Sequence, residues 1–348
     1  MVSDDVELVL QLGTEDDEYT QLIEWTRRQD HLDETAMYPF IEGFIGFVSK
    51  RLGSMRVDRM EDEDSFSRQR ALLPFKRANT NADSSDNNKD DTRPSILLRA
   101  VHDDKVDYAQ NLPAQTYYKD VVPVIVATHL TGEEDTALAQ LAIDNRELYA
   151  NQHNRRFTWG FVVCGSVVRA CVFNNDHIFA SKRMDVTEPK GRKDLVSVLV
   201  NLEYCAEDQL GFDPSITMND DGSVKELSSY DPETDTTLTY EVHALLSAAT
   251  KNFGRHTRSF LCKKKPSQPG DPFIVVKDTW EKATLDEEGN EDLPESKTSN
   301  AAKSVGKNAK VIHSGSVLID KDGVKVKDNS LTMFGMHIPK KSQKQPEL

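Results

Sequence analysis

The stretch VVPVIVAT, residues 121–128, is a nearly continuous run of apolar and mostly β-branched side chains. A run of this kind is typical of a strand that is buried on both faces of a sheet. Pro123 has no N–H to give to a strand pair, so it must lie near the start of the strand. The stretch therefore predicts the central strand of an α/β sheet.

A helix is predicted directly after this strand. Thr131 and Glu134 have the spacing of a capping box at its start, and an apolar stripe recurs at helical intervals: Leu138, Leu141, Ala142, Leu148 and Tyr149. Residues 157–163 then predict a second strand. A helix between two strands is the usual crossover that makes them parallel neighbours.

Further elements complete this region. Gly165-Ser166 is a suitable hairpin turn between strands at 157–163 and 167–173. Shorter strands are predicted at 96–98 and 178–180, and a second helix at about 192–209, with Gly211 as its stop. The order of elements predicts an α/β domain with a mixed sheet over residues 94–216.

The flanking regions differ in composition. Residues 1–57 predict a helical lead-in, whose apolar stripe consists of Tyr38, Ile41, Phe44, Ile45, Val48 and Leu52. Residues 58–93 are polar and acidic, which predicts a disordered insert. Residues 217–280 predict a small β unit with strands near 238–240, 254–262 and 273–277. Residues 281–348 predict a largely polar tail, with a hairpin at 311–338 around Asp322-Gly323.

Charge and cysteine content restrict the class of protein. The formal net charge of -15 opposes non-specific binding to nucleic acids, which depends on Lys and Arg. The four cysteines have no metal-binding spacing and are interpreted as reduced. The acidic N-terminus does not resemble a secretion signal, and no apolar run reaches the length of a membrane span. We therefore expect an intracellular protein, cytoplasmic or nuclear, that does not contact a membrane.

Four segments, in their order and spacing over about residues 115–280, resemble the fungal-type protein kinase family. The first is Asn154-Arg155-Arg156-Phe157-Thr158-Trp159-Gly160-Phe161, followed by Cys164-Gly165-Ser166 and Val168-Arg169. The others are Leu210-Gly211-Phe212-Asp213-Pro214-Ser215-Ile216, Gly254-Arg255-His256-Thr257-Arg258 and Val275-Val276-Lys277-Asp278-Thr279-Trp280. The resemblance implies a front part that is similar to a restriction-endonuclease-like fold and a second part that is similar to the N-lobe of a kinase.

For the kinase-like part, the resemblance implies nucleotide contacts at Lys277, Gly254 and Thr257, and ATP with Mg²⁺ as the ligand. Lys277 matches the strand lysine that binds the α- and β-phosphates, and residues 254–257 match the loop that covers the phosphates. This loop has one glycine instead of three, and the chain contains neither His-Arg-Asp nor Asp-Phe-Gly. We therefore predict no catalytic residue and no metal ligand. Lys277 could equally be a solvated lysine on a strand edge.

For the nuclease-like part, a magnesium site needs an acid on one strand and Glu-x-Lys on the next. Pro94-Ser95 and Ala127-Thr128-His129 occupy these two positions, and neither carries a carboxylate. Asp103 and Asp104, or Glu133 and Glu134, could supply ligands from loops, but solvated or helix-capping roles are more common for such residues.

Three functions remain open. The first is a non-catalytic regulatory or scaffold module that lacks the catalytic lobe and acts through protein partners. The second is a fragment of an active protein kinase that transfers phosphate from ATP. The third is a degenerate nuclease-like module that binds nucleic acid, which the acidic charge disfavours. The sequence gives no indication of the oligomeric state.

Overall fold

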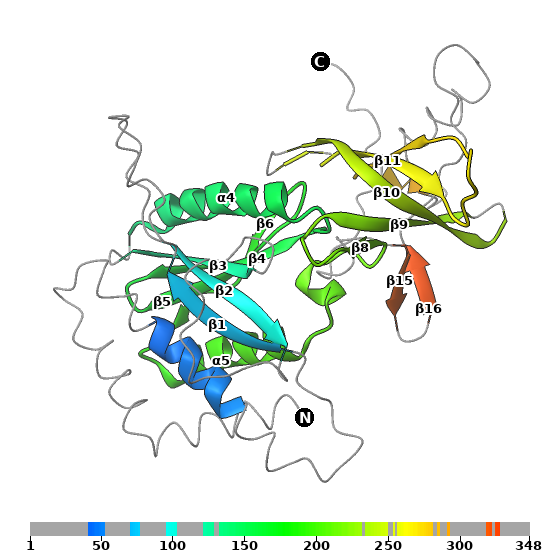
Figure 1. The fold of residues 1–348 in the computed structure, drawn as a ribbon. Coiled ribbons are helices and arrows are strands. Elements are labelled where there is room, and N and C mark those ends of the chain that lie inside the picture. The colour runs from blue at the N-terminus through cyan, green and yellow to red at the C-terminus, as the bar shows by residue number, and fades with distance from the viewer. Residues whose placement is uncertain are drawn as a thin grey trace, which may run out of the picture. The chain divides into compact units, whose positions relative to one another are not determined.

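The structure is a computed structural model, and its elements are shown in Figure 1. It describes residues 41–52, 70–76, 95–102, 121–128, 132–231, 234–249, 253–254, 256–280, 284–285, 291–292, 318–321 and 324–327. The chain divides into two compact units. Unit 1 holds most residues up to Gly211, and unit 2 holds the residues from Phe212 onward. Two short segments, 153–156 and 174–176, belong to unit 2, although their neighbours in sequence belong to unit 1.

Unit 1 contains a mixed seven-stranded sheet in the order β1-β2-β3-β4-β5-β6, with β7 paired to β5. The strands are β1 Arg70–Lys76, β2 Ser95–His102, β3 Val121–Thr128, β4 Thr158–Cys164, β5 Val167–Phe173, β6 Ile178–Ala180 and β7 Met184–Asp185. β3 and β4 are parallel, whereas the other pairs are antiparallel. All eight residues of β3 are buried, as its apolar sequence predicts.

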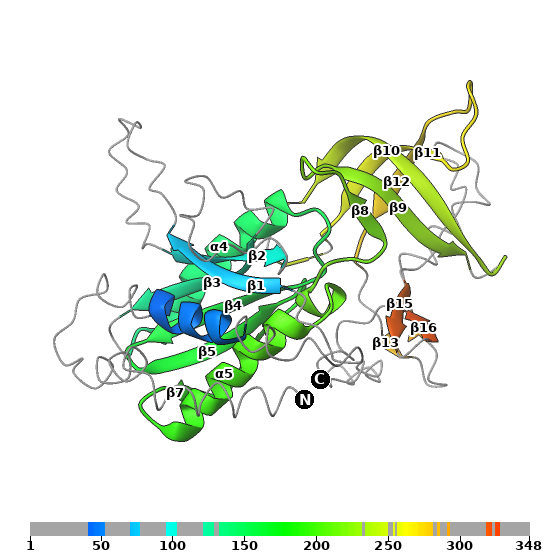
Figure 2. The ribbon, with the colours of Figure 1, turned by 60° about the horizontal axis from the view of Figure 1, so that its bottom comes forward.

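Helices cover both faces of this sheet (Figures 1 and 2). α4, Glu134–Asn151, is the crossover between β3 and β4 and packs on one face. α5, Pro189–Tyr204, and the helix at residues 41–52 lie on the other face, where Ser49 donates a buried hydrogen bond to Glu203 at 2.7 Å. The α/β class predicted from the sequence is confirmed.

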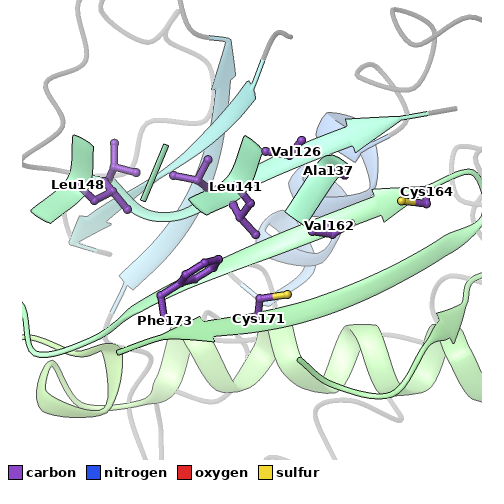
Figure 3. Close-up of a cluster of buried hydrophobic side chains, with 10 residues drawn as sticks. Val126, Ala137, Leu141, Leu148, Val162, Cys164, Cys171 and Phe173 are labelled. Atoms are coloured by element: carbon purple, nitrogen blue, oxygen red, sulfur yellow. The ribbon is translucent and has the colours of Figure 1, made fainter. Parts of the chain in front are cut away.

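The main core of unit 1 lies between α4 and the sheet (Figure 3). Leu141 and Leu148 of α4 face the strand residues Val162 and Phe173, and each of the four is at most 2% exposed. The tyrosine of the predicted stripe also takes part, because Tyr149 donates a 2.9 Å hydrogen bond to the Phe173 carbonyl. The stripe predicted for residues 41–52 is buried as well.

Three local predictions need correction. Residues 58–93 were expected to be a disordered insert, but residues 70–76 form β1, because Ala71, Leu72, Leu73 and Phe75 supply an apolar stretch. The second helix ends at Tyr204, because Cys205 is extended; Gly211 instead ends a 3₁₀ turn at Asp208–Leu210, with φ +97°. Glu133 is the N-cap residue of α4, so Glu134 does not close a capping box, and Thr131 lies outside the described residues.

Unit 2 contains a five-stranded antiparallel sheet in the order β12-β11-β10-β9-β8. Its strands are β8 Ile216–Met218, β9 Val224–Asp231, β10 Thr236–Ala248, β11 Arg258–Lys264 and β12 Ile274–Asp278. Phe260, Cys262 and Tyr240 lie at the centre of a small core on one face of the sheet, each no more than 5% exposed. Sequence analysis identified β10, β11 and β12 but not β8 or β9.

Two short hairpins follow in the tail region. β13 Thr284–Leu285 pairs with β14 Glu291–Asp292, and β15 Leu318–Lys321 pairs with β16 Val324–Lys327. The second of these pairs lies within residues 311–338, the range in which a hairpin was predicted. Among the described residues, none of the helices is both long enough and apolar enough to cross a membrane.

Candidate functional site

The sheet of unit 2 has an open face formed by β10, β11 and β12, which lie side by side in Figure 2. Residues that pair directly across strands share a face. One row on the open face is Val275, Leu261 and Ala244, and the next is Lys277, Ser259 and Ser247. Val275 is 62% exposed, and Leu261 and Ala244 follow it across the three strands. We call Val275, Leu261 and Ala244 the apolar strip.

Lys277 lies at one end of the apolar strip. It is two residues from Val275 on β12, so both side chains leave the same face of the strand. Its side chain is exposed, whereas the alternate residues Ile274 and Val276 pack against the core. The predicted position of Lys277 on a strand is therefore found, and the side chain faces an apolar surface as well as water.

The other two predicted nucleotide contacts lie in the loop between β10 and β11. Thr257 shares a 2.9 Å hydrogen bond with the Thr279 hydroxyl, directly beyond the end of β12, so Thr257 and Lys277 are at the same end of the sheet. Gly254 has φ +116°, which disfavours any other residue. Its N–H, however, donates to the Asn175 carbonyl at 2.7 Å and is therefore not directed at a ligand.

The opposite end of the apolar strip carries an aromatic group. Phe273 is 53% exposed; the Lys263 ammonium lies 4.8 Å from its ring centroid, and the His243 ring, nearly perpendicular, has its centroid at 5.0 Å. A cation over an aromatic ring contributes about 0.5–1 kcal/mol at an exposed site. The strip therefore has a positive charge near both ends, from Lys277 and from Lys263.

The opposite face of the same strands carries a cluster centred on Arg258. Arg258 is 3% exposed and is the direct cross-strand partner of Asp278. Its guanidinium contacts the Asp278 carboxylate at 3.4 Å and donates to two backbone carbonyls, those of His153 and of Arg155, the latter at 2.8 Å. Arg258 therefore joins β11, β12 and segment 153–156.

Segment 153–156 is held by a second set of contacts. The Arg155 guanidinium lies 3.5 Å from the Phe212 ring centroid, and Arg156 donates to the Phe212 carbonyl at 3.2 Å. The Asp213 N–H donates to the Asn154 carbonyl at 2.7 Å. The structure thus brings together one part of each of the four segments quoted above. We call Arg155, Phe212, Asp213, Arg258 and Asp278 the motif cluster.

Burial and nearby charges shift the pKa of Asp278, in the motif cluster, and of His153 beside it. Burial raises the pKa of Asp278 to about 6, although Arg258 acts against this shift, and Asp213 adds to it by repulsion. Burial lowers the pKa of His153, and the nearby Arg258 charge lowers it further. Both groups therefore resist carrying a charge in the folded chain.

The two strand positions expected for a nuclease site, Ser95 on β2 and Ala127 on β3, lie next to each other, and neither carries an acid. Ser95 pairs with Val126, the residue before Ala127, and Ala127 is completely buried. Glu133 accepts a 2.8 Å hydrogen bond from Thr128. Glu134 pairs with Arg183 at 2.8 Å and with Arg169 at 3.4 Å. In the part of the chain that the structure describes, no three His, Cys, Asp or Glu side chains gather in a way that could hold a metal ion.

Sequence reasoning did not identify Arg258 and Asp278 as members of a site. Both were quoted within the family segments, next to Thr257 and Lys277, and their alternation with these residues was the available signal. What the sequence could not reveal was that segment 153–156, about 100 residues earlier, supplies the carbonyls that Arg258 binds.

Comparison with known proteins gives one finding. No curated protein and no solved structure matches the chain. The family model described as "Fungal protein kinase" matches residues 94–345, which include the whole motif cluster and Lys277, and the chain therefore belongs to the fungal protein kinase family.

Proposed function

We propose that this protein is a kinase-like regulatory or scaffold module that binds ATP on the open face of β10–β12 and does not transfer its phosphate. The observation that carries the proposal is the position of Lys277 at the end of the exposed apolar strip. A purine base needs an apolar surface, whereas the phosphates need a cation close by. The strip and Lys277 could supply both, with the Thr257 hydroxyl at the phosphate end.

The non-catalytic part of the proposal rests on the sequence. Phosphoryl transfer needs a base that orients the attacking hydroxyl and acids that hold magnesium. The chain has neither His-Arg-Asp nor Asp-Phe-Gly. Mg²⁺ bound to the nucleotide would neutralise part of the phosphate charge. The residues that would contact the nucleotide are Lys277, Thr257 and the apolar strip. A module with these properties would act through the protein partners that it contacts.

A thermal-shift titration with ATP, with and without Mg²⁺, tests nucleotide binding. ATP should raise the melting temperature of the wild type in a saturable way, since a ligand at 100 times its Kd stabilises the fold by about 2.7 kcal/mol. The rise should disappear in Lys277→Ala. The matched control is Lys225→Ala, which removes an exposed lysine of β9 and should retain the full rise.

Two results would contradict the proposal. Equal shifts in the wild type and Lys277→Ala, or no shift in either, would exclude nucleotide binding at this face. Transfer of labelled phosphate from ATP to a protein substrate, lost in Lys277→Ala, would instead favour the fragment of an active kinase, whose missing parts another chain would supply.

A further inference from the structure

The two faces of β11 and β12 carry different residues. Arg258 and Asp278 pair directly and lie on the face of the motif cluster. Their immediate neighbours, Ser259 and Lys277, pair directly and lie on the open face. Thr257, which precedes Arg258, and Thr279, which follows Asp278, are joined by a hydrogen bond. A shift of Arg258 or Asp278 must therefore move residues of the proposed nucleotide site.

Arg258 also holds segment 153–156 against β11. Two carbonyls of this segment, those of His153 and Arg155, accept from the one guanidinium. Arg155 also forms an isolated β-bridge with Phe212. A buried backbone carbonyl that loses its hydrogen-bond donor destabilises the conformation that buries it. Arg258 is therefore a major reason why the segment lies against β11.

We infer that Arg258 is a positioning residue that couples ATP binding at Lys277 to the docking of segment 153–156 on β11. This inference rests on the proposed function. Arg258 holds both the segment and the carboxylate that follows Lys277, so an ordered segment fixes the end of β12. Coupling between two binding events is reciprocal, so ATP bound at Lys277 must in turn hold the segment more firmly.

The experiment is hydrogen exchange of the full chain, read by mass spectrometry on peptides that cover residues 153–156, with and without ATP. In the wild type, ATP should slow exchange in these peptides. In Arg258→Lys the charge remains, but a lysine cannot replace the planar guanidinium that serves three acceptors. Exchange of the segment should then be about tenfold faster without ATP, and ATP should bind several-fold more weakly.

The matched control is Arg192→Lys. Arg192 also donates to two backbone carbonyls, those of Val186 and Thr187, but it belongs to unit 1. This variant should leave exchange at 153–156 and ATP affinity as in the wild type. A fold that is merely weakened would raise exchange in many peptides, whereas the inference predicts a change centred on 153–156 together with weaker ATP binding.

Asp278→Asn is the second variant, in case Arg258→Lys fails to fold. It keeps the bonds from Arg258 to the two carbonyls and removes the charge that links them to β12. The segment should stay protected without ATP, and added ATP should no longer slow its exchange. Continued slowing by ATP in Asp278→Asn would contradict coupling through this pair.

The outcomes separate this inference from the proposed function. Wild-type exchange rates at 153–156 in Arg258→Lys, or loosened exchange with unchanged ATP affinity, would overturn the inference and leave ATP binding intact. An absence of any ATP-dependent thermal shift in the wild type would overturn the proposed function and, with it, the coupling.

Discussion

At the scale of single residues, Asp278 and His153 contact or face the same guanidinium and respond to pH in opposite ways. The raised pKa of Asp278 means that the folded chain holds this proton more firmly than the unfolded chain does. Its contribution to stability is complete below about pH 4 and is lost as the pH rises through about 6. The lowered pKa of His153 has the reverse effect: its contribution is present above about pH 6.5 and is lost on acidification.

The variant Asp278→Asn separates these two effects. It removes the contribution that grows on acidification and leaves that of His153, so the unfolding free energy should fall more steeply than in the wild type between pH 7 and pH 5. Urea denaturation at pH 7, 6 and 5 measures this difference, and other titrating groups cancel in the comparison. If the free energies of variant and wild type run parallel over this range, the pKa of Asp278 is not raised in the folded chain.

At this scale, the sequence was sufficient to place Lys277 on a strand but not to identify the residues that surround it. A lysine at the end of an apolar β-branched strand is visible in the local pattern, because the alternation of neighbouring residues fixes its face. The Arg258 contacts depend on residues 153–155, and long-range contacts of a charged side chain leave no local pattern. The use of the Gly254 N–H by Asn175 was invisible for the same reason.

At the scale of elements, the start of α5 has a close contact with β7. A Cβ atom added at Gly191 would lie 2.0 Å from the Asp185 carbonyl oxygen. Backbone atoms on both sides prevent an easy adjustment, so the helix and the strand would have to separate. Gly191 is thus required by the packing of α5 and not by a turn, because its φ is not left-handed.

Gly191→Ala should therefore destabilise unit 1 by about 1–3 kcal/mol, the usual cost of overpacking. Urea denaturation followed by circular dichroism measures the loss. The control is Gly46→Ala in the helix at 41–52, where an added Cβ meets nothing within 4 Å. That variant should be stabilised by about 0.5–1 kcal/mol, because alanine favours the helix. Equal effects of the two substitutions would contradict this interpretation.

The element boundaries show where local patterns are sufficient. Strands with continuous apolar runs, such as β3, were predicted with their correct bounds. β9 was missed because its sequence, VKELSSYD, has few apolar residues, and its pairing with β8 and β10 leaves no local pattern in the sequence. β10 has register shifts between Val242 and Ala244 and between Leu245 and Ser247, which interrupt the period of two that sequence analysis depends on.

At the scale of the whole molecule, the formal net charge of -15 determines how the chain meets other macromolecules. Long-range repulsion opposes contact with the phosphate backbone of DNA or RNA. We predict no binding of the full chain to duplex DNA or to single-stranded RNA at about 50 mM salt, a concentration at which electrostatic binding is strong. Filter binding or fluorescence anisotropy measures this. Binding that weakens steeply with added salt would support the nucleic-acid-binding alternative.

The α/β class was predictable at this scale because the order of elements follows from local periodicity. The division into two units was harder to predict, because segments 153–156 and 174–176 belong to unit 2 but are surrounded in sequence by residues of unit 1. Sequence analysis read residues 157–173 and their neighbours as one continuous α/β region. Short segments of this kind have no apolar run or period of their own that would separate them from their neighbours.

The two faces of β12 restrict how the strand can vary in length. Odd and even positions of this strand serve different purposes, because Val275 and Lys277 lie on one surface, whereas Ile274, Val276 and Asp278 lie on the other. Insertion or deletion of one residue within the strand would exchange the two sets, burying the lysine and exposing the core. Insertions and deletions in related proteins should therefore collect in the turn at residues 265–272, and the strand itself should keep a constant number of residues.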